Sequence, residues 1–437
     1  MRAVFFTIFI VAALAQTAFY PFGGVLLWTW FSLLQPQDEA FAFGYTRTIP
    51  FNALIALVTI VAWLVARERK LPPLQFLVIA VGVFLAWITF NSFHAFDPHQ
   101  SWPIWNGTWK IMLLGLLIAT LATTQARIHA IVVTSVLCLL YYGVKGGLFT
   151  ILTGGQNHVL GPLLSIIGDN NQLALAILMT IPLAIYMMRV SANVWVRRGL
   201  AAAIALSIIS VIGSYSRGAL ISLTVLGLVW ILSTRRGFLY LGIAATVIGG
   251  ASFFMPPSFW QRASTIQSIA ENGSKVDPSV HGRVEAWHVA YYYARDHFPF
   301  GAGFYCPQLP ELFDRYFPGE KPHAAHSIYF QVLGEQGFIG LGIYVMILAA
   351  AFWKCSRIIK DTQNRPELEW ANQLTRMIRM SLLMFCIAGS ALSMAYYDLF
   401  VNLLALLVPI SELCAVRRPA TLPVRSSAFP AREGAVA

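Results

Sequence analysis

Apolar runs of about 20 residues recur along almost all of the 437-residue chain, and no other feature constrains its fold as strongly. A run of this length crosses the hydrocarbon core of a bilayer as an α-helix. Only 11% of the residues are charged, whereas soluble proteins average about 25%. Outer-membrane barrels are excluded because their strands alternate between polar and apolar residues. The sequence therefore predicts an all-α, polytopic membrane protein.

The positions of these runs predict about 12 transmembrane helices. The first two runs are short and are separated by Pro21 and two glycines, so residues 1–35 cross the membrane either once or twice. The total is therefore 12 or 13. The predicted segments are residues 3–20, 22–35, 48–66, 74–93, 108–123, 128–150, 171–188, 199–215, 219–234, 238–255, 326–353, 378–396 and 398–415.

The basic residues indicate the orientation of these helices. Most of the 30 Lys and Arg residues fall in alternate gaps between the apolar runs, which is the pattern of cytoplasmic loops under the positive-inside rule. The same distribution argues against nucleic-acid binding, although the net charge is +11. We expect the C-terminus in the cytoplasm and the long loop on the opposite face.

Four regions are expected along the chain. The long loop contains a predicted helix over residues 279–297, which Pro278 precedes and Pro299 follows. After it, residues 299–322 are rich in Gly, Pro and aromatic residues and are predicted to be irregular. The regions are transmembrane helices 1 to about 10 in residues 1–255, a loop domain outside the membrane in 256–325, C-terminal transmembrane helices in 326–415, and a disordered tail in 416–437.

Two arginines on the predicted outer face depart from the positive-inside pattern. Arg217 lies in the short turn 214–218 between two apolar runs, where a membrane-buried charge costs on the order of 2.5–3.5 kcal/mol. Arg283 lies near the start of the predicted outer helix, and its planar fork suits a phosphate. The alternatives are snorkelling for Arg217, and pairing with Glu285 or stacking on Trp287 for Arg283. We favour anion binding for both.

The third candidate is His326, which stands at the start of the predicted segment 326–353. A lone histidine is more often structural than catalytic. This one lies at the expected outer interface beside the basic loop, and imidazole titrates near neutral pH. We therefore interpret His326 as catalytic, with His323, His281 and His288 as weaker candidates.

Three short motifs surround the long loop in a fixed order. They are Ser216-Arg217-Gly218-Ala219, then Gly282-Arg283-x3-Trp287, then His326 followed by Gly334-Glu335-x-Gly337-x2-Gly340. Together they resemble the O-antigen ligase superfamily, membrane enzymes that attach lipid-linked glycans to the lipid A core. The resemblance covers roughly residues 160–415, and the first 130 residues are similar to a subgroup described as O-glycosylation ligases.

The resemblance implies a GT-C-like glycosyltransferase fold in a bacterial inner membrane, in contact with membrane lipids. It implies a donor of undecaprenyl diphosphate carrying a glycan, an acceptor hydroxyl on the lipid A-core oligosaccharide, and an active site that faces the periplasm. It implies neither a metal nor another cofactor. The essential arginines of the family correspond to Arg217 and Arg283, and its essential histidine corresponds to His326.

Glycosyl transfer from a diphosphate needs positive charge at the leaving group and a base at the acceptor hydroxyl. The chain has no Asp-x-Asp motif, and two preorganised arginines can take the place of a metal. We predict an inverting, metal-independent reaction with Arg217 and Arg283 at the diphosphate and His326 as the general base. Further predicted substrate contacts are Arg262, Lys321, Trp287, His323, Tyr215, Asp169 and Asp398.

Several alternatives stay open at this point. Asp38 and Glu39 lie in the first outer loop, where GT-C enzymes often place a catalytic carboxylate. An O-antigen polymerase or a protein O-glycosyltransferase would use the same donor and architecture. A lipid or glycan transporter is a more distant alternative, because most predicted spans lack charge at their centre and no internal repeat occurs.

Overall fold

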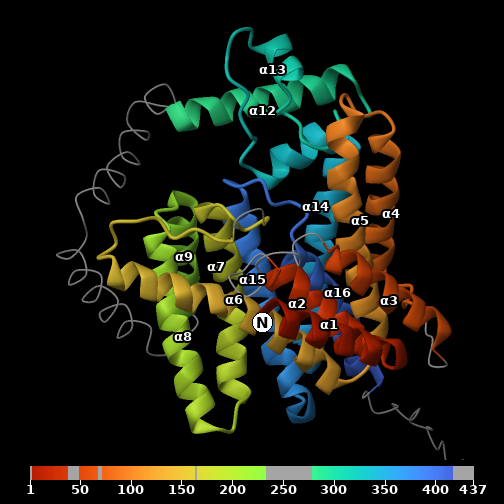
Figure 1. Ribbon diagram of the computed structural model, residues 1–437, viewed down its shortest axis with the longest axis vertical. Coiled ribbons are helices and arrows are strands. Elements are labelled where there is room, and N and C mark those ends of the chain that lie inside the picture. The colour runs from red at the N-terminus through yellow and green to blue at the C-terminus, as the bar shows by residue number, and fades with distance from the viewer. Residues whose placement is uncertain (1, 38–48, 67–70, 163–164, 233–277, 417–437) are drawn as a thin grey trace, which may run out of the picture.

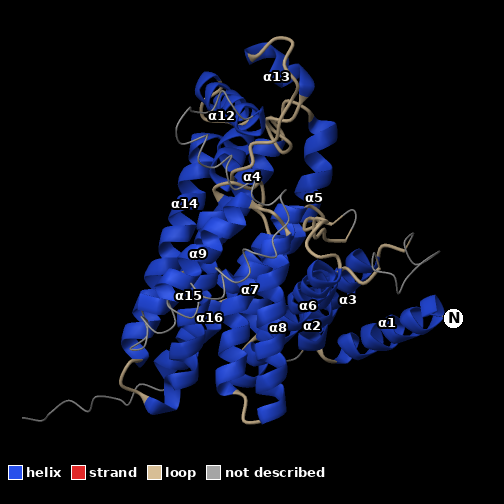
Figure 2. Cartoon of the chain, turned by 90° about the vertical axis from the view of Figure 1, so that its left-hand side faces the viewer, coloured by secondary structure: helices blue, strands red, loops and turns tan. Residues whose placement is uncertain are grey.

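The computed structural model describes residues 2–37, 49–66, 71–162, 165–232 and 278–416. Within these ranges every regular element is helical (Figure 2), so the predicted all-α class is confirmed. The predicted segment 238–255 and the tail from residue 417 lie outside the described residues.

The helices fall into two groups along the chain. The first group is α1 (Arg2–Phe19), α2 (Pro21–Leu34), α3 (Phe51–Val65), α4 (Phe76–Ser92), α5 (Pro98–Leu121), α6 (Gln125–Leu152), α7 (Asn170–Val190), α8 (Val194–Gly213) and α9 (Arg217–Leu232). The second group is α12 (Pro278–Asp296), α13 (Pro310–Tyr316), α14 (Ile328–Thr362), the 3₁₀ turn Pro366–Leu368, α15 (Glu369–Gly389) and α16 (Asp398–Val416).

Six of the described helices are long and apolar enough to cross a membrane, namely α5, α6, α7, α8, α14 and α16. Five more apolar helices are shorter, with 10 to 17 residues each. The chain is thus a multi-pass helical membrane protein by length and composition, and the total of 12 spans stays a prediction.

The starts of α5, α6, α7 and α8 follow from local chemistry, because a capping side chain precedes each of them. The Asp97 side chain accepts hydrogen bonds from the backbone N–H groups of His99 and Gln100, and Pro98 takes the first position of α5. These features satisfy the free donors at a helix start. The predicted segment 108–123 therefore began too late, because α5 begins ten residues before that apolar run does.

Two predicted segments in the C-terminal half also had wrong boundaries. The structure replaces segment 326–353 with the longer α14, and it starts α15 at Glu369 rather than at residue 378. Polar residues at the lower ends of both helices continue the helical backbone beyond the apolar part. By contrast, the predicted outer helix 279–297 agrees with α12 to within one residue at each end.

The helices form a bundle with a separate head above it (Figure 1). We call residues 278–327 the head; it contains α12, α13 and their connections. Among the described helices of the bundle, α16 and α7 are the most buried. Every residue from Asp398 to Ile410 and from Leu173 to Ala184 is buried. The head has a small apolar core of its own, which includes Ala286, Val289 and Phe313. The helices α4 and α5 rise beside the head (Figure 1), and the Phe96 N–H donates to the Ala302 carbonyl at 2.8 Å.

The helix α14 is broken at Gly337, which has φ 69° and ψ −175°. A side chain is disfavoured there for two reasons. The positive φ favours glycine, and a Cβ atom would lie 2.5 Å from the Pro299 carbonyl oxygen. The break separates a short upper piece, residues 328–336, from the long lower piece of α14. We call residues 328–336 the arm.

Candidate active site

His326 lies in the last loop of the head, two residues before α14 begins. Its backbone is left-handed, with φ 42°, which is uncommon for a residue with a side chain. The indole N–H of Trp287 on α12 donates to the carbonyl of Ala325 at 2.6 Å. The same indole stacks on the ring of Phe330, with centroids 4.8 Å apart. Trp287 therefore fixes the residues on both sides of His326.

Three predicted site residues act electrostatically on His326. Burial lowers the pKa of His326 below its usual value, and the positive charge of Arg283 lowers it further. The carboxylate of Asp169 acts in the opposite direction, and His323 adds a smaller lowering effect. The structure thus brings together groups from α12, from the start of α7 and from the head loop.

The imidazole of His323 packs against the backbone of α12 at Gly282. A Cβ atom at Gly282 would lie 2.5 Å from the His323 ring, so the glycine of the second motif allows this contact. Next to it, Glu285 forms an ion pair with His281 at 3.2 Å. The interaction of Glu285 that the structure shows is therefore with His281, on the preceding turn of the helix.

Arg217 opens α9 directly after a tight turn. The turn contains Tyr215 with φ 56°, and the Ser216 hydroxyl accepts a hydrogen bond from the Ala219 N–H at 3.2 Å. The side-chain amide of Asn170 donates to the Ser214 carbonyl at 2.6 Å. This bond ties the turn to the start of α7, where Asp169 also lies.

The turn before α9 and the start of α14 both contact the end of α15. A Cβ atom at Gly218 would lie 3.2 Å from the Ala391 side chain, and a Cβ atom at Gly389 would lie 2.9 Å from Ile328. Arg217 and His326 are therefore at the same end of the bundle, on two sides of one helix end.

The structure gives less direct evidence on three other predicted substrate contacts, which are Tyr215, Lys321 and Asp398. Tyr215 is buried, and its hydroxyl donates to the Gly155 carbonyl. Lys321 is exposed on the head. Asp398 is only 7% exposed and forms a hydrogen bond with Ser32 of α2. Their roles as substrate contacts stay predictions, and Arg262 lies outside the described residues.

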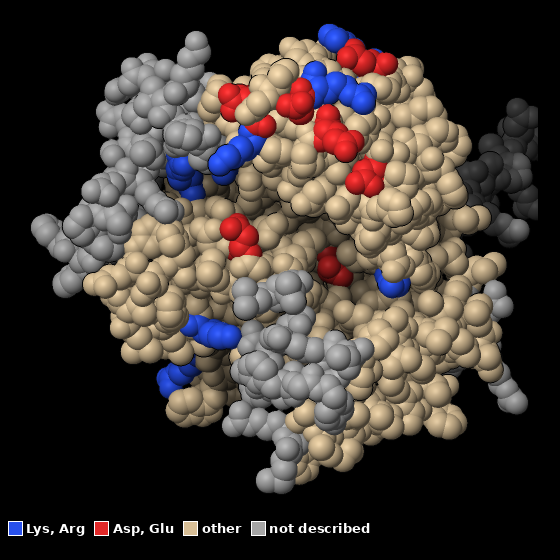
Figure 3. Space-filling model, turned by 45° about the horizontal axis from the view of Figure 1, so that its top comes forward, with Lys and Arg blue, Asp and Glu red and all other residues tan. Residues whose placement is uncertain are grey.

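The face that carries the head is hollowed between the head and the bundle (Figure 3). Basic and acidic side chains gather over α12 and α13, and single charged residues stand inside the hollow (Figure 3). Among the described residues, no three His, Cys, Asp or Glu side chains are grouped as a metal site. Metal independence stays a prediction that needs a chelator experiment.

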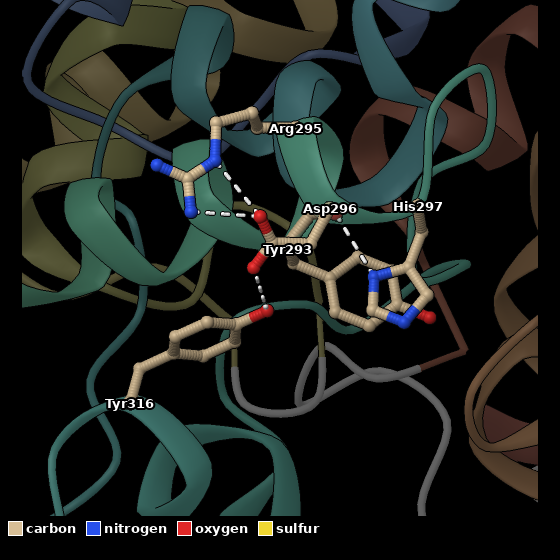
Figure 4. A network of polar contacts seen from close by, with 5 residues as sticks. All are labelled: Tyr293, Arg295, Asp296, His297 and Tyr316. Carbon is tan, nitrogen blue, oxygen red and sulfur yellow. Dashed lines mark hydrogen bonds and ion pairs between the residues drawn. The ribbon is translucent and has the colours of Figure 1, made fainter.

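A second polar network lies at the far end of α12 (Figure 4). Arg295 holds Asp296 by an ion pair at 2.7 Å, and the Tyr316 hydroxyl donates to the other Asp296 oxygen at 3.3 Å. The hydrogen bond from Arg295 lowers the pKa of Asp296. Burial and the nearby carboxylate raise the pKa of Tyr316 to about 12. This network joins α12 to α13 and stabilises the head.

From the sequence, Glu335 is expected to orient its neighbours or to receive a pair inside the bundle, but the other members of the buried polar cluster around it were not identified. Asn91 of α4, Gln336 of the arm region and Tyr396 before α16 all contribute side-chain hydrogen bonds to it. The polar residue Asn91 near the end of an apolar run was the signal that could have indicated such a cluster. The partners of Asn91 in this cluster are more than 200 residues away from it, so no local pattern identifies them.

Two family models match parts of the chain. Residues 200–345 match the model of a family described as O-antigen ligase. Residues 1–192 match the model of a family of unknown function. No curated protein matches the chain. The first match contains all three residues that we predicted to be catalytic.

Proposed function

Since the match over residues 200–345 assigns the chain to the O-antigen ligase superfamily, we propose that it transfers a glycan from undecaprenyl diphosphate to a hydroxyl of lipid A-core. The family assignment itself supports a ligase- or polymerase-type activity. The observation that carries the finer proposal is the grouping of His326 with Arg283 and Asp169. In this proposal the reaction takes place at the periplasmic face of the inner membrane.

The arginines act on the leaving group. Cleavage of the glycosyl–phosphate bond leaves an additional negative charge on the diphosphate. Fixed cations in a site that excludes water stabilise such developing charge strongly. Arg283 on α12 and Arg217 at the start of α9 are suited to this role, because each stands at the end of the bundle that carries His326. They would bind the diphosphate without a metal.

His326 acts on the acceptor. The acceptor hydroxyl must lose its proton as its oxygen attacks the anomeric carbon from the side opposite the diphosphate. A neutral imidazole accepts that proton. The lowered pKa keeps His326 neutral at physiological pH. Because the oxygen attacks from the side opposite the diphosphate, the configuration at the anomeric carbon is inverted. Asp169 is placed to hold the resulting imidazolium by charge attraction.

Reconstituted transfer is the direct test of this proposal. Purified protein in nanodiscs would be mixed with undecaprenyl-diphosphate glycan and lipid A-core in the presence of EDTA. We expect glycan on lipid A-core, detected as a mass shift of the lipid. Longer lipid-linked chains without lipid A-core product would instead identify a polymerase. Activity that returns only with Mg²⁺ or Mn²⁺ would refute the metal-independent mechanism and direct attention to Asp38 and Glu39.

The pH dependence of transfer should follow the charges around His326. Because its pKa is lowered, the acid limb of kcat/KM should lie below the usual value of about 6.5 for histidine. Asp169→Asn removes a negative charge that raises this pKa, so the acid limb should move to lower pH. His323→Ala removes a group that lowers it, so the limb should move to higher pH. Shifts in the same direction for both variants would contradict the assignment of His326 as the base.

A further inference from the structure

Glu335 is a buried carboxylate that the proposed chemistry does not use. Only 3% of this residue is exposed. The Tyr396 hydroxyl donates to one carboxylate oxygen at 2.8 Å, and the Gln331 side-chain amide donates to the other at 3.3 Å. The backbone N–H of Tyr305 also donates to this carboxylate. Glu335 therefore joins the arm, the head and the segment before α16.

The arm carries His326 at its upper end. It comprises residues 328–336. Because the backbone at Gly337 is not helical, the arm need not point in the same direction as the lower part of α14. Its own backbone does not determine how it stands on the bundle, because the helical hydrogen bonds are interrupted at the break. The contacts at its lower end must do so, and Glu335 is the carboxylate at that end.

The arm and the head form one unit. Trp287 of α12 stacks on Phe330 of the arm. A Cβ atom at Gly334 would lie 2.9 Å from the Ala290 side chain, so the arm and α12 are in close contact. The N–H of Ala302 donates to the Gly334 carbonyl at 2.8 Å. Arg283 and His326 belong to this unit.

The bundle holds this unit from the other side. Asn91 of α4 donates to the Glu335 carbonyl at 2.7 Å. The N–H of Ala395 donates to the Gln331 side-chain oxygen at 3.1 Å, and Tyr396 reaches the Glu335 carboxylate. Arg217 and Asp169 begin helices of the bundle. The two halves of the candidate site therefore meet through the contacts around Glu335.

We propose that Glu335 is a positioning residue that fixes the head and arm on the bundle. We call the contacts around Glu335 the joint. Through it, Glu335 would hold Arg283 and His326 in a fixed position relative to Arg217. The inference rests on the proposed function, because the relative position of Arg283, His326 and Arg217 matters only if these residues act on one substrate. A displacement of about 1 Å between reacting groups can lower a rate about 10²-fold.

The main test is Glu335→Gln, which keeps the shape of the side chain. It replaces one acceptor oxygen with an NH₂ donor that faces groups already donating. We expect kcat for glycan transfer to fall by about 10²-fold, with KM for the donor unchanged, because no substrate contact is removed. Tyr396→Phe removes one of the three hydrogen bonds and should produce a smaller loss of kcat in the same direction.

The matched control is Asn372→Ala in α15. Asn372 is also buried and donates to the Ile359 carbonyl at 3.0 Å and to the Thr362 hydroxyl at 2.8 Å. It links α14 and α15 below the arm and does not touch the joint. We expect it to lower the thermal midpoint while leaving kcat per folded molecule unchanged. An equal loss of kcat in Asn372→Ala and Glu335→Gln would overturn the proposal.

Hydrogen exchange provides a readout that does not depend on activity. In Glu335→Gln, the amides of residues 299–305 and of the arm should exchange faster than in the unmodified protein, while amides in the lower bundle should not. Faster exchange throughout the chain, or none at the joint, would show that Glu335 only supports the fold. If the unmodified protein transfers no glycan, the proposed function fails, and exchange alone still decides whether Glu335 fixes the joint.

Discussion

Replacing His326 with alanine should lower kcat for glycan transfer by about 10²–10⁴-fold, the range for loss of a general base. Without the imidazole, the acceptor hydroxyl has no positioned group to accept its proton. The donor should still bind, because the arginines remain in place. Transfer rates and donor affinity would be measured on the same nanodisc preparation, so that a folding defect is separated from a chemical one.

The control for this variant is His288→Ala. His288 lies on α12, is exposed, and contacts the Val284 carbonyl of its own helix at 2.8 Å. Removing it should leave transfer unchanged. If His326→Ala kept more than about a tenth of the rate, the base would have to be another group, with Asp169 as the first to test.

Arg283→Ala and Arg217→Ala should each reduce kcat by about 10²–10³-fold, as expected for loss of one preorganised group that stabilises developing charge. Lysine at either position should restore only part of the rate, because an ammonium lacks the bidentate fork of arginine. The measurement is single-turnover transfer at saturating donor in EDTA, which excludes substrate dissociation as the cause.

The matched control is Arg295→Ala on the same helix. Arg295 is paired with Asp296 and lies at the other end of α12 (Figure 4), so its loss should not affect the leaving group. Equal effects of Arg295→Ala and Arg283→Ala would mean that the head tolerates no arginine loss. In that case the diphosphate assignment of Arg283 would fail.

Much of this architecture could be predicted because its signals are local. The helix α12 was predicted to within one residue, since prolines mark both of its ends. Arg283 and His326 were both predicted as site residues beside one loop; the charge of Arg283 acts on His326, and their catalytic roles stay predictions. Asp169 was predicted as a substrate contact, and that role stays a prediction; its side chain caps the start of α7, and its charge acts on His326.

The remaining features depend on packing between distant segments. Asp398 seemed placed for substrate, yet it is buried against Ser32 of α2, and no local pattern indicates that α2 packs there. The break at Gly337 looks in the sequence like a site for close helix packing. In the structure, a Cβ atom at Gly337 would lie 2.5 Å from the Pro299 carbonyl oxygen, and no local pattern indicates that Pro299 passes there.

The joint around Glu335 also has a consequence for biosynthesis. Its parts come from α4, the head, α14 and the segment before α16, so they are synthesised between residues 91 and 396. A nascent chain that has inserted only its first helices lacks the last partner, Tyr396. The contacts around Glu335 can then be completed only after residue 396 has been synthesised.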